Sequence, residues 1–504
     1  MSHNALSLDL FFKVNDNCLL IRQFLIIFTK YRIIQKSTDM QRKTIILAAA
    51  LALILGGTAS AQQKADPKGG ISADMLKEIR KGYEGTASDK AIKNALNTTG
   101  INVLAANSEN IAMIDTHFSD KVKTKGITDQ KSSGRCWLFS GLNVLRAKMI
   151  DKYDLGPFTF SQNYVFFYDQ LEKANLFLQG VIDTKDKSFD DREVDWLFAN
   201  PIGDGGQFTG VANLIMKYGV VPSDIMPETL CANNTGQMRT QIATKLREDG
   251  LKLRDAKAKD CQAMKTEMLK EIYRMLVICL GEPPVEFEYT MRNSKDEVIS
   301  TKTYTPLSFY KEYVGEDLNN GYVMLMNDPC REYYKVYEIA YDRHVYDGRN
   351  WVYLNLPVDK IKEIAIASIK DNTAMYFSCD VGKFSDRQKG TLDLRTFDYG
   401  SLFGTTFPMD KKQRVMTHAS GSSHAMTLIA VDLKNGKPVK WMVENSWGAA
   451  SGYKGNLIMT DEWFNEYMFR LVVENKYVPA DLKGMLSQKP ILLPAWDPMF
   501  LPEE

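Results

Sequence analysis

Apolar residues spaced three or four positions apart predict a long helix in the second hundred residues. Leu138, Leu142, Leu145 and Met149 repeat with the period of one helix face. We expect Cys136 to stand at the start of this helix. The thiol would then lie in the first turn, where the positive end of the helix dipole favours a thiolate.

Two β-rich apolar runs near the end of the chain predict a pair of antiparallel strands. One run begins at His424 and the other ends at Asn445. Between them lies Asn435-Gly436, a dipeptide typical of a tight hairpin turn. The hairpin would place His424 beside Asn445, and Trp447 would shield the hydrogen bond between them from water.

The residue types at these two places indicate nucleophilic catalysis. Cys136 is the candidate nucleophile, and Gln130, six positions earlier, is the candidate donor to an oxyanion. A cysteine in this setting needs a base and a residue that orients the base, and His424 and Asn445 are the candidates. Removing the Gln130 donor should lower the rate about a hundredfold to a thousandfold. The alternative reading of Cys136 alone is a small buried hydrophobic residue.

The pattern between the two motifs predicts further elements. Ser161 is expected to cap a helix that runs through Tyr168 and Leu171, and residues 213–218 continue another. Farther along, the pattern indicates charged amphipathic helices over 240–280, a hairpin over 285–305 and a helix around 359–369.

The order Gln, Cys, His, Asn along the chain resembles that of the papain-type cysteine peptidases. Four further segments are similar to the bleomycin hydrolase and aminopeptidase C family within that group. They are Asp-Gly-Gly-Gln at 204–207, Lys-Tyr-Gly-Val-Val-Pro at 217–222, Met-Pro-Glu-Thr at 226–229 and Leu-Pro-Ala-Trp-Asp-Pro-Met at 493–499. Together they cover most of the chain from about Leu96 onward.

The resemblance implies an α+β fold, a papain-like two-lobed cysteine peptidase with a helical lobe, an antiparallel β lobe and a large helical insertion. We expect the helical lobe with the nucleophile at 136–235, the insertion at 236–372, the β lobe with the histidine and asparagine at 373–480, and a C-terminal arm at 481–504. In this family, inserted helical elements build a homohexameric barrel whose active sites face an internal chamber. A homohexamer is therefore expected.

The same resemblance indicates how a peptide substrate binds. Gly205 and Gly206 would offer bare backbone to the substrate chain. In the family the C-terminal arm lies in the substrate cleft, and its terminal carboxylate, here that of Glu504, would hold the free ammonium of the substrate. Residues 500–504 are bulkier and more acidic than the arm ends of many relatives. A solvated acidic tail is the alternative reading of this end.

His418 is the alternative to His424 as the base. The sequence Met-Thr-His-Ala at 416–419 also resembles the family sequence around its catalytic histidine. We prefer His424 because a strand follows it directly, and His418 then lies in a loop near the cleft. His117 and His344 have no comparable context, so both are predicted to be surface or capped histidines.

A secretory signal peptide is predicted at residues 40–61. It has a basic start, an apolar stretch and an Ala-Ser-Ala cleavage site at 59–61. Residues 1–39 are expected to be an upstream extension assigned by mistake, which leaves 62–504 as the mature peptidase domain. A buried core helix is the alternative reading of the apolar stretch. We expect an exported protein, periplasmic or secreted, with no membrane association after signal cleavage.

Composition allows an enzyme without identifying one. The 504 residues are 44% hydrophobic and 25% charged, which suffices for a large core. A net charge of +1 argues against nucleic-acid binding as a main role. The seven cysteines are widely spaced, and Ser133 stands where many secreted papain-like enzymes carry a disulfide cysteine, so few or no disulfides are expected. Neither a metal-ligand pattern nor a phosphate-loop pattern is present in the sequence, so no cofactor is expected.

The function predicted from the sequence is an exported, thiol-dependent aminopeptidase that hydrolyses peptides through an acyl-enzyme on Cys136. One alternative is a papain-like endopeptidase or amide hydrolase. Another is a catalytically idle hexameric binding protein. The complete set of Gln130, Cys136, His424 and Asn445 argues against an idle site.

Overall fold

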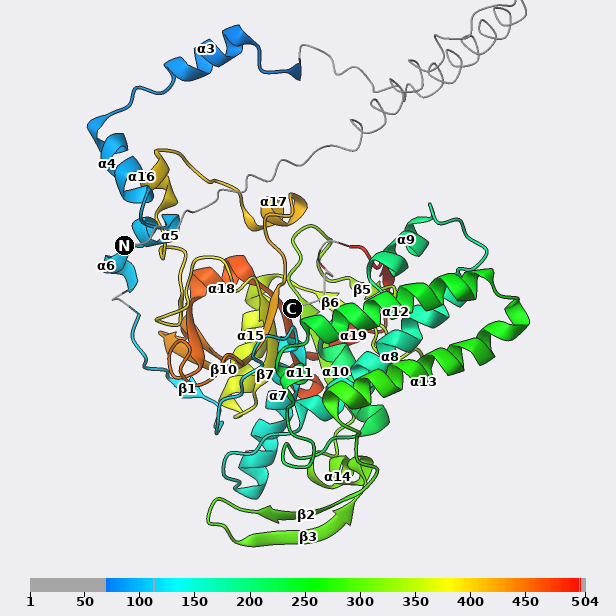
Figure 1. Ribbon diagram of the computed structural model, residues 1–504. Coiled ribbons are helices and arrows are strands. Elements are labelled where there is room, and N and C mark those ends of the chain that lie inside the picture. The colour runs from blue at the N-terminus through cyan, green and yellow to red at the C-terminus, as the bar shows by residue number, and fades with distance from the viewer. Residues whose placement is uncertain (1–68, 112–113, 498, 500–504) are drawn as a thin grey trace, which may run out of the picture. The chain divides into compact units, whose positions relative to one another are not determined.

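The computed structural model describes residues 69–111, 114–497 and 499 of the chain (Figure 1). The chain divides into two units at residue 91. The described part of the first unit contains α3 (Ala73–Lys81) and the start of α4 (Ala87–Leu96). The side chain of Ser72 caps α3 by accepting a hydrogen bond from the backbone amide of Met75.

Three predictions fall on residues that are not described. The signal peptide at 40–61 and the upstream extension at 1–39 both lie outside the described ranges, and so does Glu504. Across 69–111, 114–497 and 499, no helix is both long enough and apolar enough to cross a membrane.

A large mixed sheet forms the centre of the second unit. Its strands are β1 (Asp120–Lys121), β4 (Tyr322–Met326), β5 (Val336–Ile339), β6 (Val352–Asn355), β7 (Met375–Cys379), β8 (Ser385–Asp386), β9 (Thr391–Leu392), β10 (His424–Lys434), β11 (Lys437–Glu444), β12 (Asn456–Thr460), β13 (Met468–Glu474) and β14 (Ile491–Leu493). Their order in the described part of the chain is β14-β5-β6-β4-β13-β7-β10-β11-β12-β9-β8, and β1 pairs with β10. Separately, β2 (Phe287–Arg292) and β3 (Val298–Tyr304) form a hairpin.

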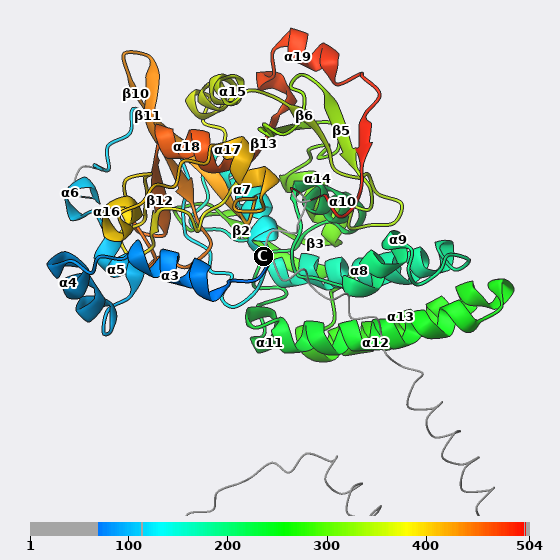
Figure 2. The same cartoon turned by 90° about the horizontal axis from the view of Figure 1, so that it is seen from above.

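Helices surround this sheet. They are α5 (Ile101–Ala105), α6 (Ser108–Ile111), α7 (Cys136–Tyr153), α8 (Gln162–Asp183), α9 (Arg192–Ala199), α10 (Phe208–Tyr218), α11 (Leu230–Asn233), α12 (Gly236–Asp255), α13 (Cys261–Leu280), α14 (Pro306–Tyr313), α15 (Val358–Lys370), α16 (Tyr399–Phe403), α17 (Lys411–Met416), α18 (Asp461–Tyr467) and α19 (Ala480–Met485), with short 3-10 turns at Ala258–Asp260 and Asn475–Tyr477. The long helices α8, α12 and α13 lie side by side (Figure 2).

Strand β10 separates two apolar cores. One core surrounds α7, α8 and α10 and includes Ala425, whereas the other lies between the sheet and the helices α15 and α18 and includes Met426. Consecutive residues of a strand face opposite sides, which accounts for the different cores of Ala425 and Met426, whereas residues 428–431 all belong to the second core. Helix α7 packs against β10 and is buried along most of its length.

The structure confirms the locally encoded elements. Helix α7 begins at Cys136, and the side chain of Ser161 accepts the amide hydrogen of Tyr164 at the start of α8. Strands β10 and β11 pair antiparallel around Asn435-Gly436, with Lys434 opposite Lys437. The predicted helices α12, α13 and α15 and the hairpin β2–β3 are also present.

Two expectations about the sheet need correction. The predicted helical insertion at 236–372 also contains β4, β5 and β6, which join the main sheet next to β13. Sequence reasoning missed these strands because β4 reads Tyr-Val-Met-Leu-Met and is buried on both faces, so it lacks the alternation of a half-exposed strand. The predicted β lobe is also not purely antiparallel, since β9 pairs parallel with β12.

Candidate active site

The candidate nucleophile and base lie where the start of α7 meets the start of β10. Cys136 is the first residue of α7 and is fully buried. Its sulfur accepts a hydrogen bond from the backbone amide of Ala425 at 3.5 Å. His424 precedes this amide directly, so the imidazole and the thiol belong to contacting segments. The thiol therefore lies at the amino-terminal end of α7.

Asn445 fixes the orientation of the imidazole. Nε2 of His424 lies 2.8 Å from Oδ1 of Asn445, and the backbone amide of Ser446 donates to the same oxygen at 2.8 Å. An amide oxygen only accepts hydrogen bonds, so Nε2 carries the hydrogen in this arrangement. Nδ1 is then the ring nitrogen that exchanges a proton with other groups. The ring of Trp447 lies 4.8 Å from the imidazole and flanks the pair.

Gln130 joins the same group of residues through Ser446. Oε1 of Gln130 accepts a hydrogen bond from Oγ of Ser446 at 2.6 Å, and Nε2 of Gln130 donates to the backbone oxygen of Ser133 at 2.6 Å. The amide nitrogen has a second hydrogen, which is the one needed for an oxyanion. The structure therefore brings Gln130 next to the Asn445 segment, and its role as oxyanion donor stays a prediction.

Sequence reasoning missed the cation that precedes the nucleophile. Arg135 is fully buried and forms a bidentate salt bridge with Glu228, with 3.2 Å from Nη1 to Oε1 and 2.8 Å from Nη2 to Oε2. The guanidinium also lies 5.2 Å from the ring of Phe139 and 5.1 Å from that of Phe166. The signal that points to this pair is the Met-Pro-Glu-Thr segment, whose acidic residue is Glu228. Ionic and cation–π contacts together fix the turn that leads into α7.

The predicted substrate-binding glycines lie in a loop that contacts the nucleophile's helix. Oδ2 of Asp204 accepts the amide hydrogen of Gly134 at 3.3 Å, and the backbone oxygen of Asp204 accepts from Nε1 of Trp137 at 2.8 Å. A Cβ on Gly206 would lie 2.2 Å from the His344 ring and 2.8 Å from the Trp137 ring. Only glycine fits there, so close packing accounts for this glycine whether or not it binds substrate.

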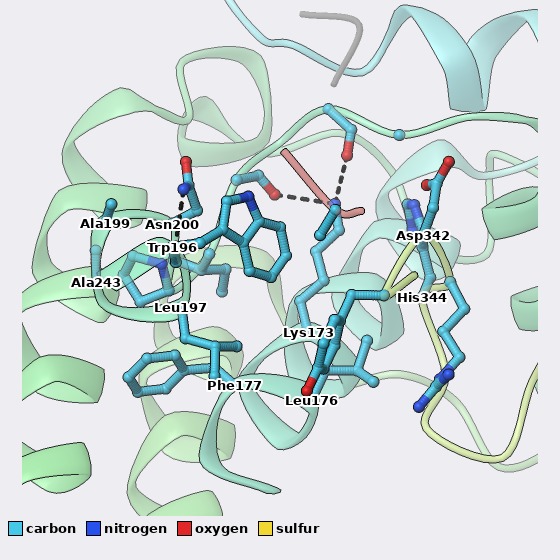
Figure 3. A pocket seen from close by; sticks show the side chains of 18 of the residues that line it. Lys173, Leu176, Phe177, Trp196, Leu197, Ala199, Asn200, Ala243, Asp342 and His344 are labelled. Carbon is cyan, nitrogen blue, oxygen red and sulfur yellow. Dashed lines mark hydrogen bonds between the residues drawn. The ribbon is translucent and has the colours of Figure 1, made fainter. Parts of the chain in front are cut away.

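Gly205 and Gly206 also line a pocket of about 710 Å³ (Figure 3). One wall is apolar and comes from α8 and α9, with Phe177 and Trp196 among its residues, and Ala495 and Trp496 line it from the C-terminal segment. The loop at 203–206, called the glycine loop below, therefore borders α7 on one side and this pocket on the other.

Comparison with known proteins identifies the family of the chain. The model of the Peptidase C1-like family matches residues 70–500. The chain belongs to this family. Aminopeptidase C of Lactobacillus delbrueckii subsp. lactis is 37% identical over 439 residues, which cover 85% of this chain and 98% of that protein. Bleomycin hydrolase of Homo sapiens is 41% identical over 389 residues, or 74% of this chain and 86% of the human protein.

A solved structure of a similar protein agrees with the overall fold. The crystal structure of PepW from Lactobacillus rhamnosis superimposes with a TM-score of 0.83 at 36% sequence identity, and it covers 86% of this chain and 100% of the other. The resemblance to the aminopeptidase C and bleomycin hydrolase family is thereby confirmed, and the protein is a cysteine peptidase.

In this peptidase, two arginines, the buried Arg470 and the partly buried Arg331, anchor the C-terminal segment. Nη2 of Arg470 donates to the backbone oxygen of Met499 at 2.5 Å, and Arg331 forms an ion pair with Asp497. Strand β14 pairs with β5, and Met499 is 2% exposed. The segment up to Met499 is therefore part of the fold, whereas Glu504 lies beyond the described residues.

The remaining histidines of the peptidase differ in environment. His418 lies in an exposed turn after α17, with a positive φ of 59°, and His117 is exposed as predicted. Of the two readings of His344, the surface position is wrong, because this residue is 4% exposed, and its Nδ1 lies 2.5 Å from Oδ1 of Asp169. Asp169 is 175 positions away in the chain, so no local pattern reveals the partner.

The described cysteines of the peptidase are free thiols. Burial, followed by the neighbouring thiol of Cys231, raises the pKa of Cys279. Within 69–111, 114–497 and 499, no group of three or more histidine, cysteine, aspartate and glutamate side chains has the arrangement of a metal site.

Proposed function

We propose that this cysteine peptidase is an exported aminopeptidase that forms an acyl-enzyme on Cys136. The observation that carries the proposal is the joint placement of three residues. Asn445 holds Nε2 of His424, and the residue after His424 contacts the sulfur of Cys136. This is the order of contacts that a thiol nucleophile, its base and an orienting group require.

The reaction follows from these contacts. The Cys136 thiolate attacks the carbonyl carbon of the first peptide bond, and Gln130 donates a hydrogen bond to the oxyanion that forms. The carbon–nitrogen bond then breaks, and Nδ1 of His424 gives its proton to the leaving amine. Water attacks the resulting thioester while His424 takes a proton from the water. Hydrolysis releases the carboxylate product and restores the thiolate and imidazolium.

Preference for a free amino terminus is proposed from the relatives and from the arm. Several relatives carry the names aminopeptidase C, G and E. The arm segment lines the pocket beside the glycine loop through Ala495 and Trp496. A carboxylate at Glu504 that reaches this region would pair with the ammonium of a substrate in a partly desolvated cleft.

The experiment compares the purified chain with its Cys136→Ala variant on two fluorogenic peptides, one with a free amino terminus and one N-acetylated. We expect cleavage of the free peptide alone and its loss in the variant. Equal cleavage of both peptides would favour a papain-like endopeptidase, and turnover of simple amides instead would favour an amide hydrolase. The absence of Cys136-dependent turnover would favour the idle binding protein.

Deleting residues 499–504 tests the arm separately. If the arm blocks the cleft and holds the ammonium, the shortened chain should cleave the N-acetylated peptide as well. An unchanged requirement for a free amino terminus would refute this role of the arm. Neither outcome changes the assignment of Cys136.

Export, the two-lobed papain-like architecture and the homohexamer are parts of the same proposal. Mass analysis of chains recovered from outside the cytoplasm should show an amino terminus at Gln62, and a start upstream of residue 40 would contradict the signal peptide. Sedimentation of the purified protein should give six times the mass of one chain. A monomer would contradict the hexamer while leaving the peptidase assignment intact.

A further inference from the structure

Three ionisable side chains form one buried cluster behind the glycine loop. Oδ1 of Asp169, on α8, contacts Nδ1 of His344 at 2.5 Å, and Oδ2 pairs with Nζ of Lys173 at 2.9 Å. Asp169 is fully buried, and the side chain of Lys173 is 13% exposed. The cluster therefore joins α8 to the segment that follows β5.

The charges in this cluster are complementary. Burial opposes ionisation of Asp169, but the positive charge of Lys173 and the contact with His344 lower the pKa of this carboxyl group. Burial, followed by repulsion from Lys173, lowers the pKa of His344. The cluster thus consists of a carboxylate, an ammonium and a neutral imidazole whose Nδ1–H donates to Asp169.

Lys173 connects the cluster to the loop. Its Nζ donates to the backbone oxygens of Gly203 at 3.0 Å and Gly205 at 2.7 Å, as the dashed lines in Figure 3 show. Together with Asp169, these oxygens occupy all three donors of the ammonium group. The loop is therefore tied to a charge held inside the protein.

His344 supports the loop from the other side of the cluster. Its ring meets the ring of Trp137 edge to face at 4.6 Å, and it fills the space into which a side chain at Gly206 would project. Trp137 directly follows the nucleophile. The cluster thus fixes the glycine loop and the first turn of α7 relative to each other.

We propose that Asp169, Lys173 and His344 are positioning residues that hold the loop at 203–206 in the shape that binds the peptide backbone. The inference rests on the proposed function, in which the substrate crosses Gly205 and Gly206. Because Lys173 bonds to the loop, its loss displaces the surface that binds substrate. The expected consequence is weaker substrate binding with little change in the reactivity of the thiol.

Lys173→Met is the test variant, because it keeps an unbranched side chain of nearly the same length and removes the ammonium. Lys217→Met is the matched control. Lys217 pairs with Glu172 at 2.8 Å and with Asp347 at 3.0 Å. It therefore links α8 to the segment that contains His344, but it makes none of the contacts that Lys173 makes with the loop. KM, kcat and the rate of Cys136 alkylation by iodoacetamide are measured for both variants and for Lys173→Arg.

We expect Lys173→Met to raise KM about tenfold while kcat and the alkylation rate stay within about twofold of the unaltered chain. Lys173→Arg, which keeps the charge, should recover part of the lost affinity, and Lys217→Met should keep the original KM. Equal changes of KM in Lys173→Met and Lys217→Met would overturn the proposal. A joint fall of kcat and alkylation rate would also overturn it, because the effect would then lie on the thiol.

Failure of the proposed function is recognised separately, as a lack of Cys136-dependent turnover in the unaltered chain. In that case a fluorescent peptide is titrated into Cys136→Ala, with and without Lys173→Met. Weaker binding in the double variant supports the positioning role. Equal dissociation constants overturn it.

Discussion

Two buried basic side chains lie near the segments that carry the proposed catalytic residues. The partners of these two side chains differ in charge. Arg135, directly before Cys136, contacts the carboxylate of Glu228. Lys411, in α17 ahead of the turn to His424, donates to Oδ1 of Asn327 at 2.6 Å and to the backbone oxygens of Met468 and Asn465 at 2.5 and 3.2 Å. None of these three acceptors carries a charge.

The difference shows what a carboxylate partner contributes to a buried cation. A guanidinium keeps its charge in any case, and Glu228 compensates that charge inside the protein. Burial lowers the pKa of Lys411 to about 7, although Glu466 opposes this shift. The charges that act on Lys411 are Glu466, Arg414 and Asp328. The turn before Cys136 is thus held by a contact with a carboxylate, whereas α17 is held by a lysine whose pKa lies at about 7.

The largest expected effect comes from breaking the first of these contacts. Arg135→Met leaves Glu228 without its guanidinium and removes the cation between Phe139 and Phe166. Removing one partner of a buried ion pair costs about 3 to 5 kcal/mol, and we expect about 3 kcal/mol because the Glu228 side chain is 26% exposed. Urea unfolding measures the loss. The double variant with Glu228→Gln should recover part of it, and a loss below about 1 kcal/mol would contradict the importance of the pair.

Stability against pH tests the second contact. The pKa of Lys411 is about 7 in the folded protein and about 10 in an unfolded chain. Between these two pH values the unfolded state keeps a proton on Lys411 that the folded state has lost. Unfolding free energy therefore rises with pH in this window, and below it the cost of the buried charge is fully present. The unfolding free energy of the unaltered chain, minus that of Lys411→Met, should increase by about 2 kcal/mol from pH 7 to pH 9. Parallel curves for the two proteins would refute the shift.

The smallest expected effect concerns the capping box at the start of α17, the helix that contains Lys411. The side chain of Asp410 accepts the amide hydrogen of Gln413 at 2.7 Å, and that of Gln413 accepts the amide hydrogen of Asp410 at 3.0 Å, which is a complete capping box. Asp410→Ala should lower the unfolding free energy by about 1 kcal/mol. The exposed Lys412→Ala is the control and should change it by less than about 0.5 kcal/mol. Equal losses would mean that the box does not stabilise α17.

Features encoded by neighbouring residues were predictable from the sequence. The start of α7 at Cys136, the cap at Ser161 and the turn at Asn435-Gly436 each depend on a few adjacent positions, and the structure has all three. The contact between His424 and Asn445 also follows, because a tight hairpin fixes which residues of its two strands lie near each other.

Features that depend on distant partners were missed. Arg135 and Glu228 are 93 positions apart, and Asp169 and His344 are 175 apart, so no spacing rule connects either pair. Gly206 was interpreted only as a substrate contact, although the His344 ring alone would exclude a side chain there. Strand β4 was missed because burial on both faces removes the alternation that identifies a strand.

The contact between Cys136 and Ala425 has a consequence for the synthesis of the chain. The two residues are 289 positions apart, so the ribosome makes the nucleophile long before the imidazole that serves it. A nascent chain that stops before residue 424 lacks the imidazole that we propose as the base for Cys136. We therefore expect unfinished copies to lack the proposed thiol-dependent activity, without a separate inhibitor.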